Sequence, residues 1–138
     1  MGAQMSLLLA SYEPSISNVI AMVPPYVESG TSPVAPRIHT PRIRTISVLW
    51  LAGEKDPHSS KRQTLETFEK ITSNEKTITW FDAGHRLPIE SIDSVIKYID
   101  SFQTQSYQSQ AYESQTPKRS KKAPLTEKTE HVSQEGEQ

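Results

Sequence analysis

Apolar positions fall into two stretches of the chain, residues 1–27 and 46–102, and become rare after them. The unbroken apolar runs NVIAMV (18–23) and ISVLWLAG (46–53) are typical of strands that are covered on both faces. TITWFDAG (77–84) is rich in the residue types that favour strands. The pattern therefore predicts three strands.

Helical patterns alternate with these strands. Residues 2–11 are good helix formers and apolar nearly all round, which favours a buried helix that Pro14 ends. Leu65, Phe68 and Ile71, at helical spacing, predict the apolar face of a second helix over residues 60–72. The face of a last, amphipathic helix is formed by Ile89, Ile92, Val95, Ile96, Ile99 and Phe102.

The resulting order predicts an α/β fold with about three parallel strands flanked by helices. The Pro-rich, basic residues 24–45 are expected to form an irregular excursion over the surface. Residues 104–138 are dominated by Gln, Ser, Thr, Lys and Glu, so they bury too little apolar surface to offset their ordering entropy. We therefore expect a domain over residues 1–103 and a disordered polar tail over 104–138.

Composition narrows the function classes. A net charge of −1 gives no general attraction to nucleic acid or anionic membranes. The absence of cysteine excludes disulfides, thiolate zinc sites and a cysteine nucleophile. No apolar run approaches the ~20 residues that span a bilayer, and no signal peptide is recognisable. The expected location is cytoplasmic; the basic run KRSKK (118–122) indicates either a nuclear alternative or simple solubilising charge.

A carboxylate and an imidazole follow neighbouring predicted strands. Asp56 comes in the turn after Gly53, and His85 comes directly after Gly84. Since reactive residues of parallel sheets gather beyond the carboxyl ends of the strands, these two side chains can meet. Asp56 would then hold one tautomer of His85 and leave the other ring nitrogen free as a base.

Plainer explanations exist for the same residues. Asp56 is also a natural turn residue before Pro57, and Glu54 is a second candidate acid. His85 could be a capping or solvent-facing histidine.

Other polar and aromatic residues have simple structural explanations. We expect His39, His58 and His131 in loop or tail, without metal-ligand spacing. Trp50 and Trp80 are expected in the core. A solvated loop accounts for Arg37, Arg42 and Arg44 better than contact with an anionic substrate does.

The motifs GEKDP (53–57) and GHRLPIE (84–90) resemble the acid turn and the histidine loop of the α/β-hydrolase family, in the right order. The opening MGAQMSLLLA resembles the continuation of that family's nucleophile elbow, G-x-S-x-G, with Gly2 as the final glycine. The resemblance covers residues 1–102, about the C-terminal half of the fold. It is to the carboxylesterase, thioesterase and dienelactone-hydrolase-like branch.

The resemblance implies a parent activity of carboxylic ester or thioester hydrolysis through a Ser-Asp-His triad. His85 would shuttle the proton, Asp56 would orient His85, and the nucleophilic serine would precede Met1. The substrate would be a small acyl ester or thioester, with no metal or organic cofactor. The chain itself contains no G-x-S-x-G, so we expect it to be inactive as written.

Two other functions remain open. A non-catalytic, regulatory protein would pair with a partner through the exposed sheet edge at residues 18–23. A remnant would have neither activity nor partner.

Overall fold

The computed structural model describes residues 1–28 and 32–115, with side chains as far as residue 103. Its centre is a parallel sheet of three strands in the order β1-β2-β3. The strands are β1 (Asn18–Met22), β2 (Ser47–Gly53) and β3 (Lys76–Phe81). Val48 of β2 lies opposite Val19 of β1 and Lys76 of β3. The α/β fold class that the sequence predicts is confirmed.

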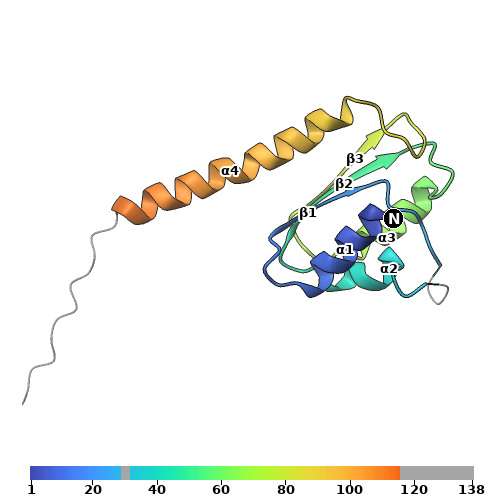
Figure 1. Cartoon of the computed structure of the whole chain (residues 1–138), viewed down its shortest axis with the longest axis horizontal. Helices are drawn as coiled ribbons and strands as arrows, with labels where there is room; N and C mark the ends of the chain where they lie inside the picture. Colours follow the sequence, from blue (N-terminus) through green and yellow to red (C-terminus); the bar gives the residue numbers. More distant parts are fainter. Residues whose placement is uncertain (29–31, 116–138) are drawn as a thin grey trace, which may run out of the picture.

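Helices lie on both sides of the sheet. They are α1 (Gly2–Tyr12), α2 (Pro36–His39), the short 3₁₀ helix η1 (Thr40–Arg42), α3 (Lys61–Glu69) and α4 (Ser91–Gln115). Figure 1 shows α1, α2 and α3 gathered on one side of the sheet and α4 on the other, with its far part projecting beyond the strands. No helix in the described ranges has both the length and the apolar character to cross a membrane.

The core lies between β2 and the helices α1 and α3. Every residue of β2 is buried, as expected for the central strand of a sheet covered on both faces. Trp50 is 1% exposed and meets the ring of Phe68 edge to face, with 5.9 Å between centroids. Trp80 is only partly buried and carries the Lys61 ammonium 5.1 Å above its ring.

The outer strand β1 is buried on one face only, which differs from the prediction. Val19 and Ala21 are buried against the core, whereas Ile20 is half-buried and Met22 is 40% exposed. The reason is that successive side chains of a strand point to opposite faces, and β1 is covered fully only on the side of α1. Ile20 and Met22 point to the other side.

The first helix also departs from the prediction of a helix buried all round. Leu7 and Ala10 are buried, but Met5 and Leu9 are 47% and 57% exposed. The prediction was wrong because α1 packs on the sheet along one side, and no described element covers its outer side. Leu65 of α3 is likewise 36% exposed rather than buried.

The predicted irregular excursion over 24–45 is wrong in its second half, where α2 and η1 form. Pro36 stands at the first turn of α2, where its fixed φ suits a helix and its missing N–H costs nothing. Arg37 then forms an ion pair of 3.2 Å with Glu66 of α3 and donates a hydrogen bond to the Tyr26 hydroxyl. These contacts hold the segment against α3.

Two predicted boundaries differ from the observed ones. The third strand ends at Phe81 rather than at residue 84, because the Ala83 N–H turns back to the Phe81 carbonyl at 2.7 Å. α4 continues to Gln115, past Phe102, the last residue of the predicted apolar face, through residues that include no proline or glycine. Residues 116–138, with the basic run at 118–122, lie outside the described residues.

Candidate functional site

Two turns meet at the carboxyl edge of the sheet, one after β2 and one after β3. The Glu54 N–H donates to the Phe81 carbonyl at 2.9 Å, and the Lys55 N–H donates to the Ala83 carbonyl at the same distance. These bonds continue the pairing of β2 and β3 beyond the strands. They bring Asp56 and His85, which follow in the two turns, to one place.

A glycine at the end of β2 permits this close approach. A Cβ atom placed on Gly53 would lie 2.2 Å from the Gly84 carbonyl oxygen and 2.5 Å from that of Ala83. No side chain fits there, since both neighbours are backbone atoms that cannot move aside without separating the turns. Gly53 therefore has a specific steric role beside the site.

Asp56 and His85 are in direct contact. The Nδ1 atom of His85 lies 3.0 Å from Oδ2 of Asp56. The Asp56 side chain is 4% exposed and that of His85 is 40% exposed. The backbone N–H of His58 donates to Oδ1 of Asp56 at 2.8 Å, so both carboxylate oxygens have a partner. This pairing compensates the burial of the carboxylate.

The contact fixes how the imidazole is protonated. An ionised carboxylate only accepts hydrogen bonds, so Nδ1 of His85 must carry the hydrogen. In the neutral ring, Nε2 then has the free lone pair, on the side of the ring away from Asp56. Since His85 is partly exposed, Nε2 can take a proton from a group that approaches from solvent.

His58 is a member of this cluster that sequence reasoning missed. Its ring meets that of His85 nearly at right angles, with 4.6 Å between centroids. The only sequence signal was its place two residues after Asp56, in a turn where a carboxylate commonly accepts the N–H of the second residue on. His58 thus contacts His85 through its ring and Asp56 through its backbone.

The second candidate acid, Glu54, lies elsewhere. Its carboxylate pairs with Lys61 at 3.0 Å. Lys55 and Asp82, which are both well exposed, form a second ion pair in these turns. The hydrogen bond from Lys55 to Asp82 raises the pKa of Lys55. Neither pair contacts His85, so the geometry favours Asp56 as the partner of the histidine.

The chain leaves β1 in an unusual backbone conformation. Val23, directly after β1, has φ of 43°, in the left-handed region that a β-branched residue rarely adopts. Such a residue costs roughly 1–3 kcal/mol and persists only where its surroundings hold it. Here its N–H donates to the Leu51 carbonyl at 2.8 Å.

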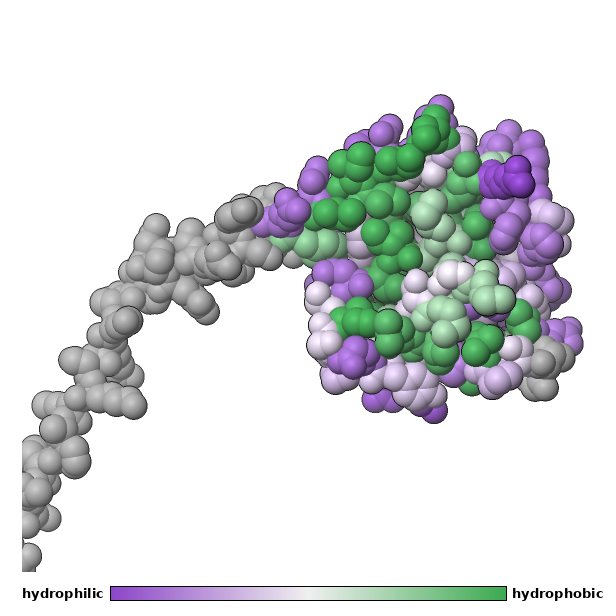
Figure 2. Space-filling view, in the orientation of Figure 1, coloured by the Kyte–Doolittle hydropathy of each residue, from purple (hydrophilic) through white to green (hydrophobic). Residues whose placement is uncertain are grey.

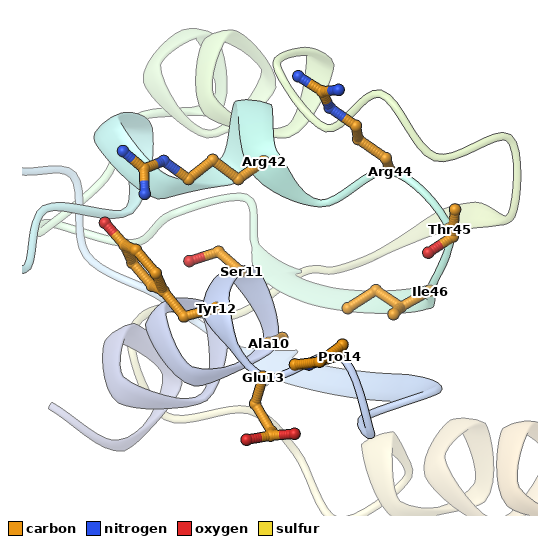
Figure 3. Close-up of a pocket in the computed structure, with 9 residues that line it drawn as sticks. All are labelled: Ala10, Ser11, Tyr12, Glu13, Pro14, Arg42, Arg44, Thr45 and Ile46. Atoms are coloured by element: carbon orange, nitrogen blue, oxygen red, sulfur yellow. The ribbon is translucent and has the colours of Figure 1, made fainter.

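Figure 3 shows a pocket of about 290 Å³ at the opposite edge of the sheet. It is lined by Ala10, Ser11, Tyr12, Glu13, Pro14, Arg42, Arg44, Thr45 and Ile46. These residues end α1 and precede β2, so the pocket lies at the amino ends of the strands. The Arg42 guanidinium lies 4.6 Å from the centre of the Tyr12 ring. Arg42 and Arg44 therefore have no part in the cluster around His85.

The remaining candidates have structural contacts. His39 is in α2 rather than in a loop; it is 5% exposed, and its Nε2 lies 2.6 Å from the Pro33 carbonyl oxygen. His131 lies outside the described residues.

Within residues 1–28 and 32–115, no three His, Asp or Glu side chains are placed to hold a metal ion.

The first helix begins at the edge of the sheet that carries the Asp56–His85 pair. α1 leads into β1 through a short connection and runs in the opposite direction, so its first turn lies near the carboxyl ends of the strands (Figure 1). The free N–H groups and the positive end of a helix dipole favour negative charge at such a position.

Comparison with known proteins supports the fold. No family model matches the chain, and no curated protein sequence matches it significantly. A solved structure of a zinc-bound, cold-adapted esterase from an Arctic intertidal metagenomic library is similar, with a TM-score of 0.61 and 21% sequence identity. The similarity covers 73% of this chain and 45% of the esterase chain. At this identity the likeness extends to the fold alone, and this chain spans less than half the length of that esterase.

Proposed function

We propose that Asp56 and His85 are the acid and the base of a serine-hydrolase active site that cleaves carboxylic esters or thioesters. The observation that carries the proposal is their hydrogen bond of 3.0 Å at the carboxyl edge of a parallel sheet. The burial of Asp56 and the partial exposure of His85 suit an orienting acid and a base that meets substrate. The esterase-like fold supports the same class of reaction.

The nucleophile would be a serine before Met1, at the start of α1. Its hydroxyl oxygen would attack the acyl carbon while Nε2 of His85 takes the hydroxyl proton. The tetrahedral intermediate would collapse with transfer of that proton to the leaving alcohol or thiol. Water, deprotonated by the same nitrogen, would then cleave the acyl-serine and release the acid. The first turn of α1 would provide backbone N–H groups for the oxyanion.

Residues 1–138 alone would lack the nucleophile and both oxyanion donors, which are the amide of the residue after the serine and a loop upstream of it, so we expect no ester turnover from them. The first test is the genomic sequence upstream of the Met1 codon. An in-frame Gly-x-Ser segment joined to it, directly or by splicing, would supply the nucleophile. A stop codon there would contradict the proposal.

The second test is kinetic and uses the native full-length product. A fluorophosphonate probe is expected to label one serine, and His85→Ala is expected to abolish turnover of p-nitrophenyl esters. Asp56→Asn should lower kcat by about 10³–10⁴-fold, because the imidazole would lose its orienting acceptor. Glu54→Gln is the matched control and should leave kcat within about twofold, since Glu54 pairs with Lys61. Turnover that persists in His85→Ala would refute the assignment.

A second candidate function is a non-catalytic protein that pairs through a sheet edge. In the described part of the chain, β1 pairs only with β2, so its other edge offers unpaired N–H and C=O groups. A partner strand could add there. A full-length product that binds no fluorophosphonate but forms a complex that Ile20→Pro abolishes would favour this function over hydrolysis.

A further inference from the structure

A groove with a volume of about 500 Å³ lies directly beside His85. Its walls come from the end of β1, from the turn after β3 and from the start of α4. They are formed by Met22, Val23, His85, Leu87, Pro88, Ile89, Ser91 and Ile92. This volume lies within the range of about 300–1,000 Å³ that is typical of small-molecule sites.

The lining of the groove is apolar apart from two polar side chains. His85 and Ser91 are its polar side chains, and it includes no Asp, Glu, Lys or Arg. Met22, Ile92 and Ile89 are nevertheless 40%, 46% and 73% exposed. Large apolar side chains held in water beside a reactive imidazole indicate a binding site for an apolar group.

The groove belongs to a wider apolar face of the molecule. Figure 2 shows apolar side chains spread across one face of the molecule, beside and below the part of α4 that lies against the sheet. Farther along α4, a second hollow is lined by Asn18, Ile20, Tyr98, Ile99, Phe102 and Gln103. Asn18 begins β1, so this hollow lies toward the amino ends of the strands. Only the first groove includes His85.

We propose that the groove beside His85 binds the aliphatic acyl chain of the substrate. This proposal rests on the proposed function, since it assigns the carbonyl end of the chain to Nε2 of His85. The chain would lie between Val23 and Ile92, with its carbonyl carbon toward the imidazole. The preferred substrates would then be neutral esters or thioesters of acids with several methylene groups, rather than acetyl esters or charged acyl groups.

The test measures binding to the full 138-residue chain and needs no turnover. Acetate, butyrate, hexanoate and octanoate carry the same charge and differ only in methylene count. Each is titrated into ¹³C-histidine-labelled protein while the His85 ring signal is followed by NMR. Affinity is expected to rise by up to about fourfold for each added methylene that enters the groove. An affinity independent of chain length, or no binding by any of the four acids, would overturn the proposal.

Two variants of α4 locate the binding. Ile92→Ser should weaken hexanoate binding by about fivefold or more, because the side chain lines the groove. Ile99→Ser is the matched control, since Ile99 is on the same helix, is 44% exposed against 46% for Ile92, and lines the other hollow. Equal losses in both variants would show that the acid binds the apolar face at large, which would also overturn the proposal.

The outcomes separate this inference from the proposed function. In one outcome, binding depends on chain length and weakens in Ile92→Ser while turnover of the full-length product survives His85→Ala. That result would support the lipophilic site and refute ester hydrolysis through His85. Turnover that requires His85 but is equal for acetyl and hexanoyl esters would leave the hydrolase and refute the acyl groove. Sedimentation at the NMR concentrations checks for self-association, and a dimer that excludes hexanoate would count against the groove as a substrate site.

Discussion

Gly53 is the residue on which the geometry of the site depends most directly. Gly53→Ala would place a methyl group 2.2 Å from the Gly84 carbonyl oxygen, so the two turns must separate. We expect a loss of about 3 kcal/mol in the free energy of unfolding, as for strong overpacking, and a lengthened contact between Asp56 and His85. Urea denaturation measures the first effect and the His85 ring signals in NMR report the second.

Gly84→Ala is the matched control for this prediction. The nearest atom to a Cβ at Gly84 is the Lys55 carbonyl oxygen at 3.7 Å, an ordinary contact. The free energy of unfolding should change by less than about 1 kcal/mol. If both glycines gave equal losses, the close approach at Gly53 would not be what determines the arrangement of the turns.

His58 is predicted to hold the ring of His85 in place. Removal of the ring contact in His58→Ala should let the His85 ring leave Asp56 more often, and the Nδ1 proton should exchange with water about fivefold faster. Nitrogen-edited NMR measures this exchange. His58→Phe keeps a ring at the contact and should restore slow exchange, whereas a loss of stability alone would affect both variants alike.

At the scale of elements, the sequence predicted which face of each strand and helix is apolar better than it predicted whether a neighbouring element buries that face. β2 was recognised because every position after Ser47 is apolar, and all of its residues are buried. The faces of α1 and α4 were recognised as apolar, yet Leu9 and Ile96 are 57% and 50% exposed. Periodicity identifies the face that prefers burial, but burial also needs a neighbour, and the pattern carries no information about one.

The candidate site shows the same division. Asp56 and His85 were predictable because a topological rule brings the ends of adjacent parallel strands together. His58 was not, because its ring reaches His85 only through the turn in which its N–H binds Oδ1 of Asp56. The helices within 24–45 were missed because Pro and Arg content indicates a loop, while the contacts of Arg37 with α3 stabilise a helix.

The attachment of α4 to the sheet is predicted to weaken at alkaline pH. Burial raises the pKa of Tyr98, which lies on α4, above the ordinary value of 10.0. Below pH 10 the phenol is neutral in both the folded and the unfolded chain, so its contribution to stability is intact. As the pH rises beyond 10, the phenol of Tyr98 ionises first in the unfolded chain. The free energy of unfolding therefore falls until the pH passes the pKa of Tyr98 in the folded chain.

Denaturation midpoints between about pH 9 and 12 test this prediction. Tyr98→Phe removes the ionisable hydroxyl, so its stability should fall less steeply with pH than that of the natural chain. Identical slopes in the natural chain and Tyr98→Phe would contradict the burial of this hydroxyl.

The molecule as a whole leaves an apolar face and a strand edge without cover in its described part. β1 has an unpaired edge, and farther along α4, beyond the groove beside His85, the side chains of Ile96 and Ile99 are exposed. Exposed edges and large apolar patches recruit other chains. A core with three strands also gives little stability to offset such association.

We therefore predict that residues 1–138 self-associate through this face, and that a charge placed on it weakens the association. Ile96→Lys should raise the dissociation constant measured by sedimentation about tenfold, because a desolvated ammonium without a partner opposes the contact. Leu9→Lys introduces the same charge at a position that is 57% exposed on the other side of the sheet, and it should change little. A natural chain that stays monomeric and unfolds in one sharp transition would show instead that three strands and their helices suffice alone.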